Sequence, residues 1–153
     1  MFHIVMVEPE IPQNTGNVAR TCSVTGSALH LIRPLGFSVD DKHLKRAGLD
    51  YWHTLNISYF DSLRELQDLY PDARFFYAST HAQNRYTDVA FRDGDFLVFG
   101  KEPAGLPKDL LAQNADHAIR IPMGEGPRSL NLSNSVAIVL YEALRQNNFL
   151  DLA

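Results

Sequence analysis

A glycine-rich loop that joins an apolar run to an amphipathic helix is the stretch of this chain best suited to chemistry. The loop, residues 122–131, contains Gly124, Gly126 and a single arginine, Arg128, and it follows a β-branched run at 119–121. A strand, a glycine-rich loop and a helix N-terminus together expose backbone amides to a ligand. An ordinary connection between a strand and a helix has the same pattern, and spacing alone leaves both interpretations open.

The helix after this loop is predicted over residues 132–145. Its apolar side chains recur at three- and four-residue spacing, which places them in one stripe along the helix. The members of the stripe are Leu132, Val136, Val139, Leu140, Ala143 and Leu144. Ser129, Asn131 and Ser133 precede or begin the stripe and are candidates for the N-cap.

A second polar cluster follows the first expected strand, residues 2–7. A helix is predicted from Asn14 to a glycine stop at Gly26, and Asn14, Asn17 and Arg20 recur in it at three-residue intervals. We expect these three side chains to project from one face near the helix start, at the sheet edge where open α/β sheets bind ligands. Capping with a surface arginine is the alternative.

Basic and aromatic side chains gather between residues 40 and 53. A short helix is predicted over 40–48, carrying Lys42 and Arg46, and Tyr51 and Trp52 follow it. Such a group could hold phosphate and stack on bases. A solvated helix face above buried aromatics explains the same residues equally well.

Strands and helices alternate along the chain. Further strands are predicted at 28–32, 55–60, 74–78, 95–99 and 118–121, with helices at 62–69 and 109–113; the polar stretch 81–91 has no periodicity and is expected to be a long excursion. This order predicts an α/β fold with a mainly parallel sheet flanked by helices. Loops 79–80, 100–105 and 122–131 should then emerge at one sheet edge and line one pocket.

Length and composition indicate one domain, residues 1–153, without repeat or linker. A net charge of −4 argues against sequence-blind nucleic-acid binding but permits a local basic patch. No apolar run approaches the roughly 20 residues of a membrane span, and the N-terminus resembles a strand rather than a signal peptide. The single cysteine, Cys22, excludes an internal disulfide and fits a core position in a protein of the reducing cytoplasm.

Several common sites are not supported by the sequence. No histidine pairs with cysteine or carboxylate at metal-ligand spacing, so no metal is expected. The chain also lacks a GxGxxG after the first strand, a GxxxxGK[ST] loop and a GxSxG elbow. These absences argue against a dinucleotide-type Rossmann site, a phosphate-binding P-loop and a serine hydrolase.

Three segments resemble the motifs of the SPOUT class of RNA methyltransferases. They are EPEIPQNTGNVAR at 8–20, FGKEPAGLP at 99–107, and IRIPM at 119–123 with RSLNLSN at 128–134. Residues 31–37 and 40–51 match as well, so the resemblance covers essentially the whole chain. The chain is most similar to the small TrmL/YibK-type members, which 2′-O-methylate the wobble nucleotide 34 of certain tRNAs.

The resemblance implies a C-terminal deep trefoil knot that holds S-adenosylmethionine. It also implies a homodimer whose active site borrows from both subunits and whose own surface presents the tRNA, with the apolar stripe of the last helix as an expected dimer face. Carried over residue by residue, the cofactor-binding set is Ala78, Gly100, Glu102, Ile121, Met123, Ser129 and Leu130.

The same resemblance implies roles at the reacting centre and on the tRNA. The expected catalytic residues are Arg20 first, then Arg128 and Tyr141. An arginine is always charged and accepts protons poorly, so we expect Arg20 to stabilise a developing alkoxide or hold a phosphate. The expected substrate-binding residues are Asn14, Asn17, Lys42, Arg46 and Asn131. Leucine tRNAs and the anticodon stem-loop are the expected partners.

Two other functions fit parts of the sequence. A knotted dimer that binds RNA or a nucleotide without chemistry is favoured by one feature, the departure of the middle motif at Lys101, Pro103 and Ala104, although Glu102 and Gly105 are kept. A flavodoxin-like nucleotide-binding domain is permitted by the α/β pattern alone.

Overall fold

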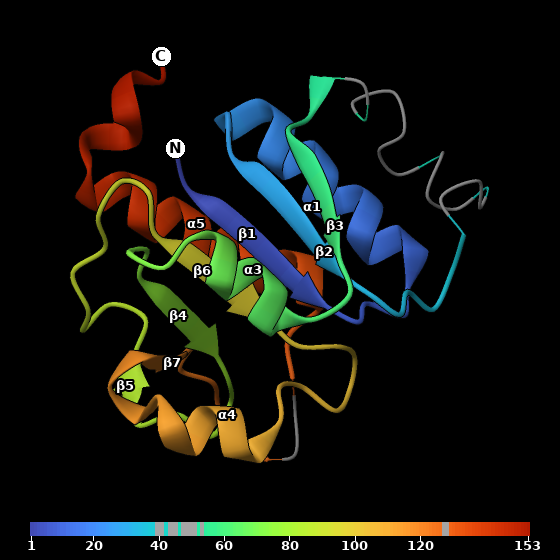
Figure 1. The fold of residues 1–153 in the computed structure, drawn as a ribbon. Coiled ribbons are helices and arrows are strands. Elements are labelled where there is room, and N and C mark those ends of the chain that lie inside the picture. The colour runs from blue at the N-terminus through green and yellow to red at the C-terminus, as the bar shows by residue number, and fades with distance from the viewer. Residues whose placement is uncertain (39–41, 43–45, 47–51, 53, 127–128) are drawn as a thin grey trace.

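Seven parallel strands form one sheet in the order β3-β2-β1-β6-β4-β7-β5 (Figure 1). The computed structural model describes residues 1–38, 42, 46, 52, 54–126 and 129–153. The strands are β1 His3–Val7, β2 Ala28–Ile32, β3 Ile57–Phe60, β4 Phe75–Ala78, β5 Asn84–Arg85, β6 Phe96–Phe99 and β7 Ala118–Arg120. The predicted α/β class with a parallel sheet is confirmed.

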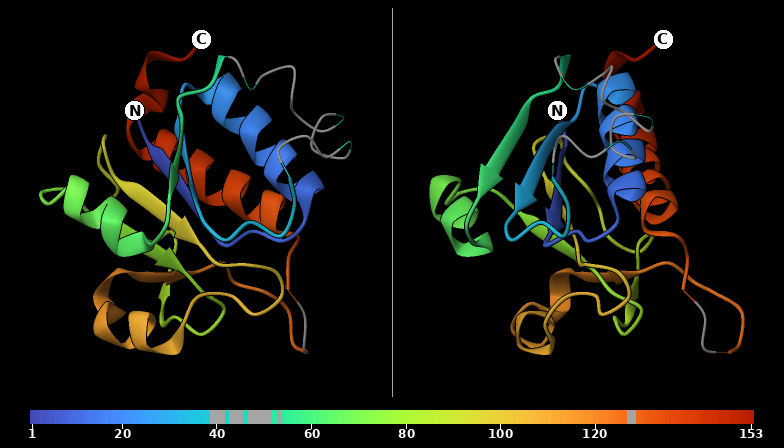
Figure 2. Two further views of the ribbon diagram at one scale, coloured as in Figure 1. Left: turned by 45° about the vertical axis from the view of Figure 1, so that its right-hand side comes forward. Right: turned by 90° about the vertical axis from the view of Figure 1, so that its right-hand side faces the viewer.

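Helices cover both faces of the sheet. They are α1 Pro12–Thr25, α3 Leu63–Leu69, α4 Lys108–Gln113 and α5 Leu132–Gln146, with 3₁₀ turns η2 Ala115–His117 and η3 Asn148–Asp151. Figure 2 shows α1 and α5 side by side against one face and α3 and α4 on the other. Within the part of the chain described, no helix has the length and apolar character needed to cross a membrane.

The central strands are mostly apolar because both of their faces are covered, with His3 of β1 and His30 of β2 as exceptions. Ile4 of β1 and Leu97 of β6 pack in the cluster beneath α1 and α5, whereas Val5 and Val98 pack in the cluster on the α3 side. Alternate residues of one strand therefore belong to two different cores.

The apolar stripe of α5 lies inside the protomer. Val136, Val139, Leu140, Ala143 and Leu144 are at most 1 % exposed, in the cluster that also contains Val18 and Cys22 of α1. The expectation that this stripe is a dimer face is therefore wrong. A periodic apolar stripe predicts a buried helix face, and here α1 and the sheet already bury it.

Most element boundaries lie within one residue of the predictions, with three exceptions, of which one is β3, beginning at Ile57 rather than at residue 55. Helix α1 begins at Pro12 rather than Asn14, because proline is well tolerated in the first turn of a helix. Strand β5, Asn84–Arg85, was not predicted, because two polar residues show no alternation of apolar and polar side chains. They form a strand only through their pairing with β7. The predicted helix over 40–48 lies largely outside the described residues.

The glycine stop of α1 is confirmed. Gly26 has φ of 64°, the left-handed conformation that favours glycine, and Ser27 N donates to Cys22 O at 2.9 Å. Cys22 is fully buried, and this burial raises the pKa of its thiol to about 12. A buried thiol that stays protonated fits the core position expected for it.

A stack of aromatic rings fills the α3 side of the sheet near its amino end. The rings of His3 and His30 are stacked, with His3 Nδ1 and His30 Nε2 at 2.9 Å, and the ring of Phe96 stacks on both. Burial lowers the pKa of each histidine to about 4. Both imidazoles are therefore neutral at physiological pH.

Candidate active site

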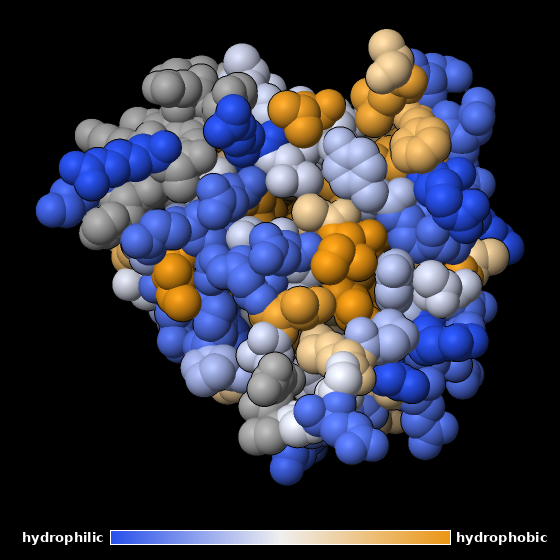
Figure 3. Space-filling model, turned by 180° about the vertical axis from the view of Figure 1, so that it is seen from behind, coloured by the Kyte–Doolittle hydropathy of each residue, from blue (hydrophilic) through white to orange (hydrophobic). Residues whose placement is uncertain are grey.

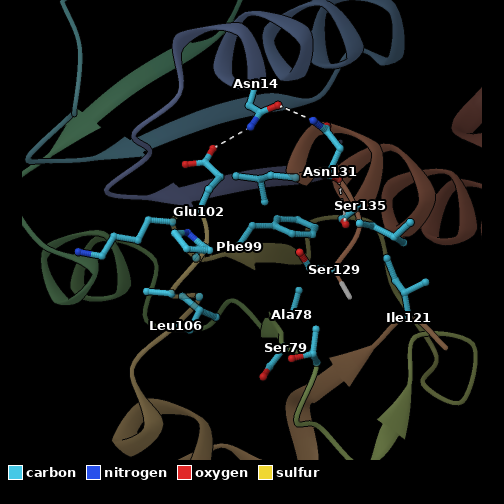
Figure 4. Close-up of a pocket in the computed structure, with 18 of the residues that line it drawn as sticks. Asn14, Ala78, Ser79, Phe99, Glu102, Leu106, Ile121, Ser129, Asn131 and Ser135 are labelled. Carbon is cyan, nitrogen blue, oxygen red and sulfur yellow. Dashed lines mark hydrogen bonds between the residues drawn. The ribbon is translucent and has the colours of Figure 1, made fainter. Parts of the chain in front are cut away.

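The loops that leave β4, β6 and β7 meet at the carboxyl edge of the sheet around one cavity (Figure 4). The cavity has a volume of about 420 Å³. Phe99, Leu106, Ile119 and Val139 give it apolar walls, while Ser79 and Ser135 add hydroxyl groups. This combination of apolar walls and a few polar groups is typical of a small-molecule site.

All seven residues expected at the cofactor line this cavity, as do Asn14 and Asn131. The seven are Ala78, Gly100, Glu102, Ile121, Met123, Ser129 and Leu130. They come from three segments far apart in sequence, which meet because parallel strands end at the same edge. The structure thus brings the predicted set into one place.

Gly100 allows the middle loop to fold back on itself. A Cβ at this position would lie 2.2 Å from the carbonyl carbon of Gly105 and 2.4 Å from the amide nitrogen of Leu106, so no other residue fits without moving backbone. Gly105 N donates to Lys101 O at 2.7 Å and closes the turn, with Gly105 at φ of 75°. Main-chain groups can therefore approach a ligand closely on this side.

A chain of side-chain hydrogen bonds joins the middle loop to α1 and α5. Asn14 Nδ2 donates to Glu102 Oε1 at 3.1 Å, and Asn131 Nδ2 donates to Asn14 Oδ1 at 3.0 Å (Figure 4). The second oxygen of Glu102 accepts from Glu10 N at 3.1 Å. Because the carboxylate can only accept, it fixes the orientation of the Asn14 amide and, through it, that of Asn131.

Asn131, one of the three predicted N-cap candidates, also caps α5. Its Oδ1 accepts from the Asn134 amide at 3.2 Å and from the Ser133 hydroxyl, and its backbone oxygen accepts from the Ser135 hydroxyl at 3.2 Å. One asparagine therefore both lines the cavity and begins the C-terminal helix.

Other predicted site residues lie away from the cavity. Asn17 and Arg20 are exposed on α1, while Asn14 is only 5 % exposed, so the expectation that the three share one face is wrong. Three-residue steps turn a helix by 300°, and each step rotates the side chain about 60° away from the last. Tyr141 is 44 % exposed on α5 and does not line the cavity.

The basic candidates are only partly described. Lys42 and Arg46 are exposed, and Arg128 lies outside the described residues. Trp52 is half-buried and packs against the core beneath α1 and α5, which favours the structural interpretation of this aromatic residue.

Some lining residues were not predicted individually. Leu106 and Ser135 are examples: Leu106 follows the sharp turn at Gly105, and Ser135 lies one helical turn after the cap Asn131. The N-cap spacing was the available signal for Ser135. Within the described ranges, no group of three or more His, Cys, Asp and Glu side chains is arranged to hold a metal ion.

Comparison with known proteins gives closely similar relatives over the whole length. A provisionally named tRNA (cytidine(34)-2′-O)-methyltransferase of Bacillus subtilis (strain 168) is 56% identical, over 99% of this chain and 96% of that protein. A solved structure described as "Structural insights into the 2-OH methylation of C/U34 on tRNA" is 46% identical, with a TM-score of 0.91 and 97% of each chain covered.

A more distant structure shares the fold. The SpoU methyltransferase AviRb from Streptomyces viridochromogenes, solved in complex with the cofactor AdoMet, aligns with a TM-score of 0.85 and 24% identity. The alignment covers 95% of this chain and 57% of AviRb. The family model for the SpoU rRNA Methylase family matches residues 1–141. With that match and these relatives, the chain belongs to the SpoU rRNA Methylase family.

Proposed function

We propose that this protein transfers a methyl group from S-adenosylmethionine to the ribose 2′-oxygen of the wobble nucleotide 34 of tRNA. Cytidine or a modified uridine in leucine tRNAs is the proposed target. The main observation behind this proposal is the cavity, which is lined by loops of the three motifs and by all seven residues expected to bind the cofactor. The proposal is supported by the activity named for the 56% identical relative and by the C/U34 methylation described for the 46% identical structure.

The residues of the cavity fit this cofactor. A volume of about 420 Å³ lies within the range of roughly 300–1,000 Å³ usual for small-molecule pockets. Phe99, Leu106 and Val139 offer apolar surface for a flat base, and the folded-back loop at Gly100 offers main-chain donors and acceptors. When bound, S-adenosylmethionine supplies an activated methyl group; AviRb provides a precedent for this cofactor on the same fold.

Arg20 is proposed to act across a dimer. It is exposed on α1 and does not line the cavity of its own chain, so it would reach the reacting centre of a second copy. There its guanidinium would stabilise negative charge on the 2′-oxygen or hold a neighbouring phosphate, because it cannot accept a proton at neutral pH. Arg128 and Tyr141 are the further candidates for this centre.

The proposed dimer face is the outer side of α1 and α5. Val24 of α1 and Tyr141 of α5 are 58 % and 44 % exposed, and Ile138 of α5 is half-buried. Figure 3 shows apolar side chains gathered near the middle of this side of the molecule, with polar groups around them. An apolar centre with a polar rim is the usual composition of an interface.

We also propose that the C-terminal segment is threaded as a trefoil knot. The chain leaves β7 beyond β4, crosses the carboxyl edge next to the middle loop and returns to lie beside α1. The bond from Asn131 to Asn14, with Asn14 bound to Glu102, ties this returning segment to the first and middle motifs. This path supports threading of the last segment through the earlier loop.

Labelled cofactor and unmodified tRNA test the function directly. Purified protein is incubated with methyl-labelled S-adenosylmethionine and total tRNA, and the label is mapped by nuclease digestion. Arg20→Ala runs beside Arg64→Ala, which removes an exposed arginine of α3 on the opposite face. Label on the 2′-oxygen of nucleotide 34, lost only in Arg20→Ala, is the expected result. Label elsewhere would change the substrate, and cofactor binding without transfer would favour the binding-protein alternative.

A further inference from the structure

A second cavity adjoins the proposed cofactor pocket at the carboxyl edge of the sheet. Its volume is about 480 Å³, and it shares Thr80, His81, Ile121, Met123 and Ser129 with the first cavity. Arg120, Gly124 and Gly126 complete the part of its lining that carries polar or open backbone groups. Neither Arg120 nor His81 belongs to the residues expected to bind the cofactor or to take part in catalysis.

Arg120 brings a positive charge that other groups leave available. Its carbonyl accepts from Tyr86 N and holds the backbone in the sheet, so the half-buried side chain is independent of that bond. Among the described residues, no carboxylate oxygen forms an ion pair with its guanidinium within 4.0 Å. The nearby Asp88 is engaged elsewhere: hydrogen bonds from Arg85 are the main cause that lowers its pKa, and Arg120 is the smallest.

Beside the apolar Ile121 and Met123, the other groups of the lining suit an oxyanion. Thr80 and Ser129 carry hydroxyl donors, and His81 is exposed with ring nitrogens that can donate. Gly124 and Gly126 have nothing within 4 Å of the place where a Cβ would stand, so a ligand can lie against their backbone. A cation, hydroxyl groups and open backbone are the groups that position nucleic-acid phosphates.

We propose that this cavity, through Arg120, binds the RNA phosphate next to the target ribose. The inference rests on the proposed function, since the ribose must reach the cofactor pocket that this cavity adjoins. A second oxyanion, the carboxylate of the cofactor's methionine part, has the same chemistry. The phosphate is favoured because the cavity is larger than a single carboxylate needs and its rim residues Thr80 and His81 are exposed to an incoming polymer.

The test compares Arg120→Gln with Arg64→Gln, which removes the same charge from the exposed surface of α3. Binding of an unmodified anticodon stem-loop is measured by fluorescence anisotropy at several salt concentrations, with S-adenosylhomocysteine present. Arg120→Gln should weaken binding about five- to tenfold and reduce the salt slope by about 1, as the loss of one phosphate contact predicts. Arg64→Gln should match the wild type.

Calorimetry without RNA separates the two oxyanions. S-Adenosylhomocysteine has the carboxylate and 5′-methylthioadenosine lacks it, so unchanged binding of both to Arg120→Gln supports the phosphate. Loss of affinity for S-adenosylhomocysteine alone would assign Arg120 to the cofactor and overturn the proposal. Equal RNA binding by Arg120→Gln and Arg64→Gln would overturn it as well.

Two further controls keep the result interpretable. Arg120→Lys keeps the charge and should keep most of the salt slope, and unchanged thermal unfolding of each variant shows that the sheet is intact. Wild-type protein that binds the stem-loop but transfers no methyl group contradicts the proposed function, while the binding comparison still decides on Arg120. Wild-type protein that methylates nucleotide 34 but shows no effect of Arg120→Gln contradicts only the phosphate site.

Discussion

Asn14 and Glu102 are 88 residues apart in the chain, yet the Asn14 amide donates to the Glu102 carboxylate at 3.1 Å. The bond joins the first motif to the second, and Asn131 extends it to the third at 3.0 Å. The wall of the cavity is therefore held by a directed network of hydrogen bonds, in which each of these groups acts either as donor or as acceptor.

Asn14→Asp should break this network. The substitution replaces the donor by a second carboxylate facing Glu102, and an unpaired buried polar group costs about 1–3 kcal/mol. We expect a lower melting temperature and loss of S-adenosylhomocysteine binding by calorimetry. Asn17→Asp makes the same change three residues away at an exposed position and should resemble the wild type. Equal behaviour of the two variants would show that the bond has no such role.

Gly100→Ala should distort the middle loop. The added Cβ would meet backbone atoms at 2.2 and 2.4 Å, and overpacking against backbone typically costs about 1–3 kcal/mol. Thermal unfolding checks this, with Gly124→Ala as the control for stability, since nothing lies within 4 Å of a Cβ there. A melting temperature as high as that of Gly124→Ala would contradict the close approach.

The free energy of unfolding should fall as the pH is lowered from 6.5 towards 4, because the stacked histidines His3 and His30 are neutral in the folded protein. Burial lowers the pKa values of His3 and His30 from 6.5 to about 4, so between these values the unfolded chain binds more protons than the folded one. Their contribution is complete above pH 6.5 and is lost as the pH falls towards 4. Denaturant midpoints measured across this window should drop less steeply in His30→Leu, although carboxylates add a common slope. If the denaturant midpoints of the wild type and of His30→Leu fall in parallel with pH, the histidines are not the cause of the lost stability.

Val24→Glu should separate the proposed dimer. A charge at the 58 % exposed Val24 would be buried without a partner in the interface and disfavour association. Light scattering after size exclusion should give a monomer that has lost methyl transfer. Leu69→Glu, at a 61 % exposed position on α3, is the matched control and should remain dimeric. Dissociation by both variants, or by neither, would place the interface elsewhere.

Mixed dimers should show which subunit supplies Arg20. Arg20→Ala and Ser135→Trp, whose indole would fill the cavity, are each expected to be inactive alone. If Arg20 serves the partner's pocket, each mixed dimer contains one intact centre, so random mixing should restore about a quarter of wild-type activity. No recovery after unfolding and refolding the mixture would mean that Arg20 acts within its own chain.

The sequence predicted elements that local chemistry determines. The buried strand β2 and the stop of α1 at Gly26 follow from an apolar run and a left-handed glycine, and both were found as expected. The convergence of the loops after β4, β6 and β7 followed from a parallel sheet, whose strands end at one edge, whereas the resemblance supplied the individual residues Ala78, Gly100 and Ile121.

Other features depend on which elements pack against one another, and sequence periodicity does not identify these packing partners. The apolar stripe of α5 was identified correctly, but the spacing of apolar residues indicates only that a helix face is buried and does not indicate which element covers it. Asn14 and Asn17 are the same residue type in one helix, and only packing against α5 separates a buried network member from an exposed side chain. Arg120 lies inside the strand predicted at 118–121, and no local pattern shows that residues 80–81 and 121–126 fold around it to form a cavity.

The cavity is completed by residues within 119–123 and 129–139, which are synthesised after β1, α1 and β6. A nascent chain that already contains β1, α1 and β6 still lacks Asn131, the residue that caps α5 and holds Asn14. A chain that lacks residues 129–139 would lack one wall of this cavity, so the cofactor that the proposed function places there could not template the early stages of folding during synthesis.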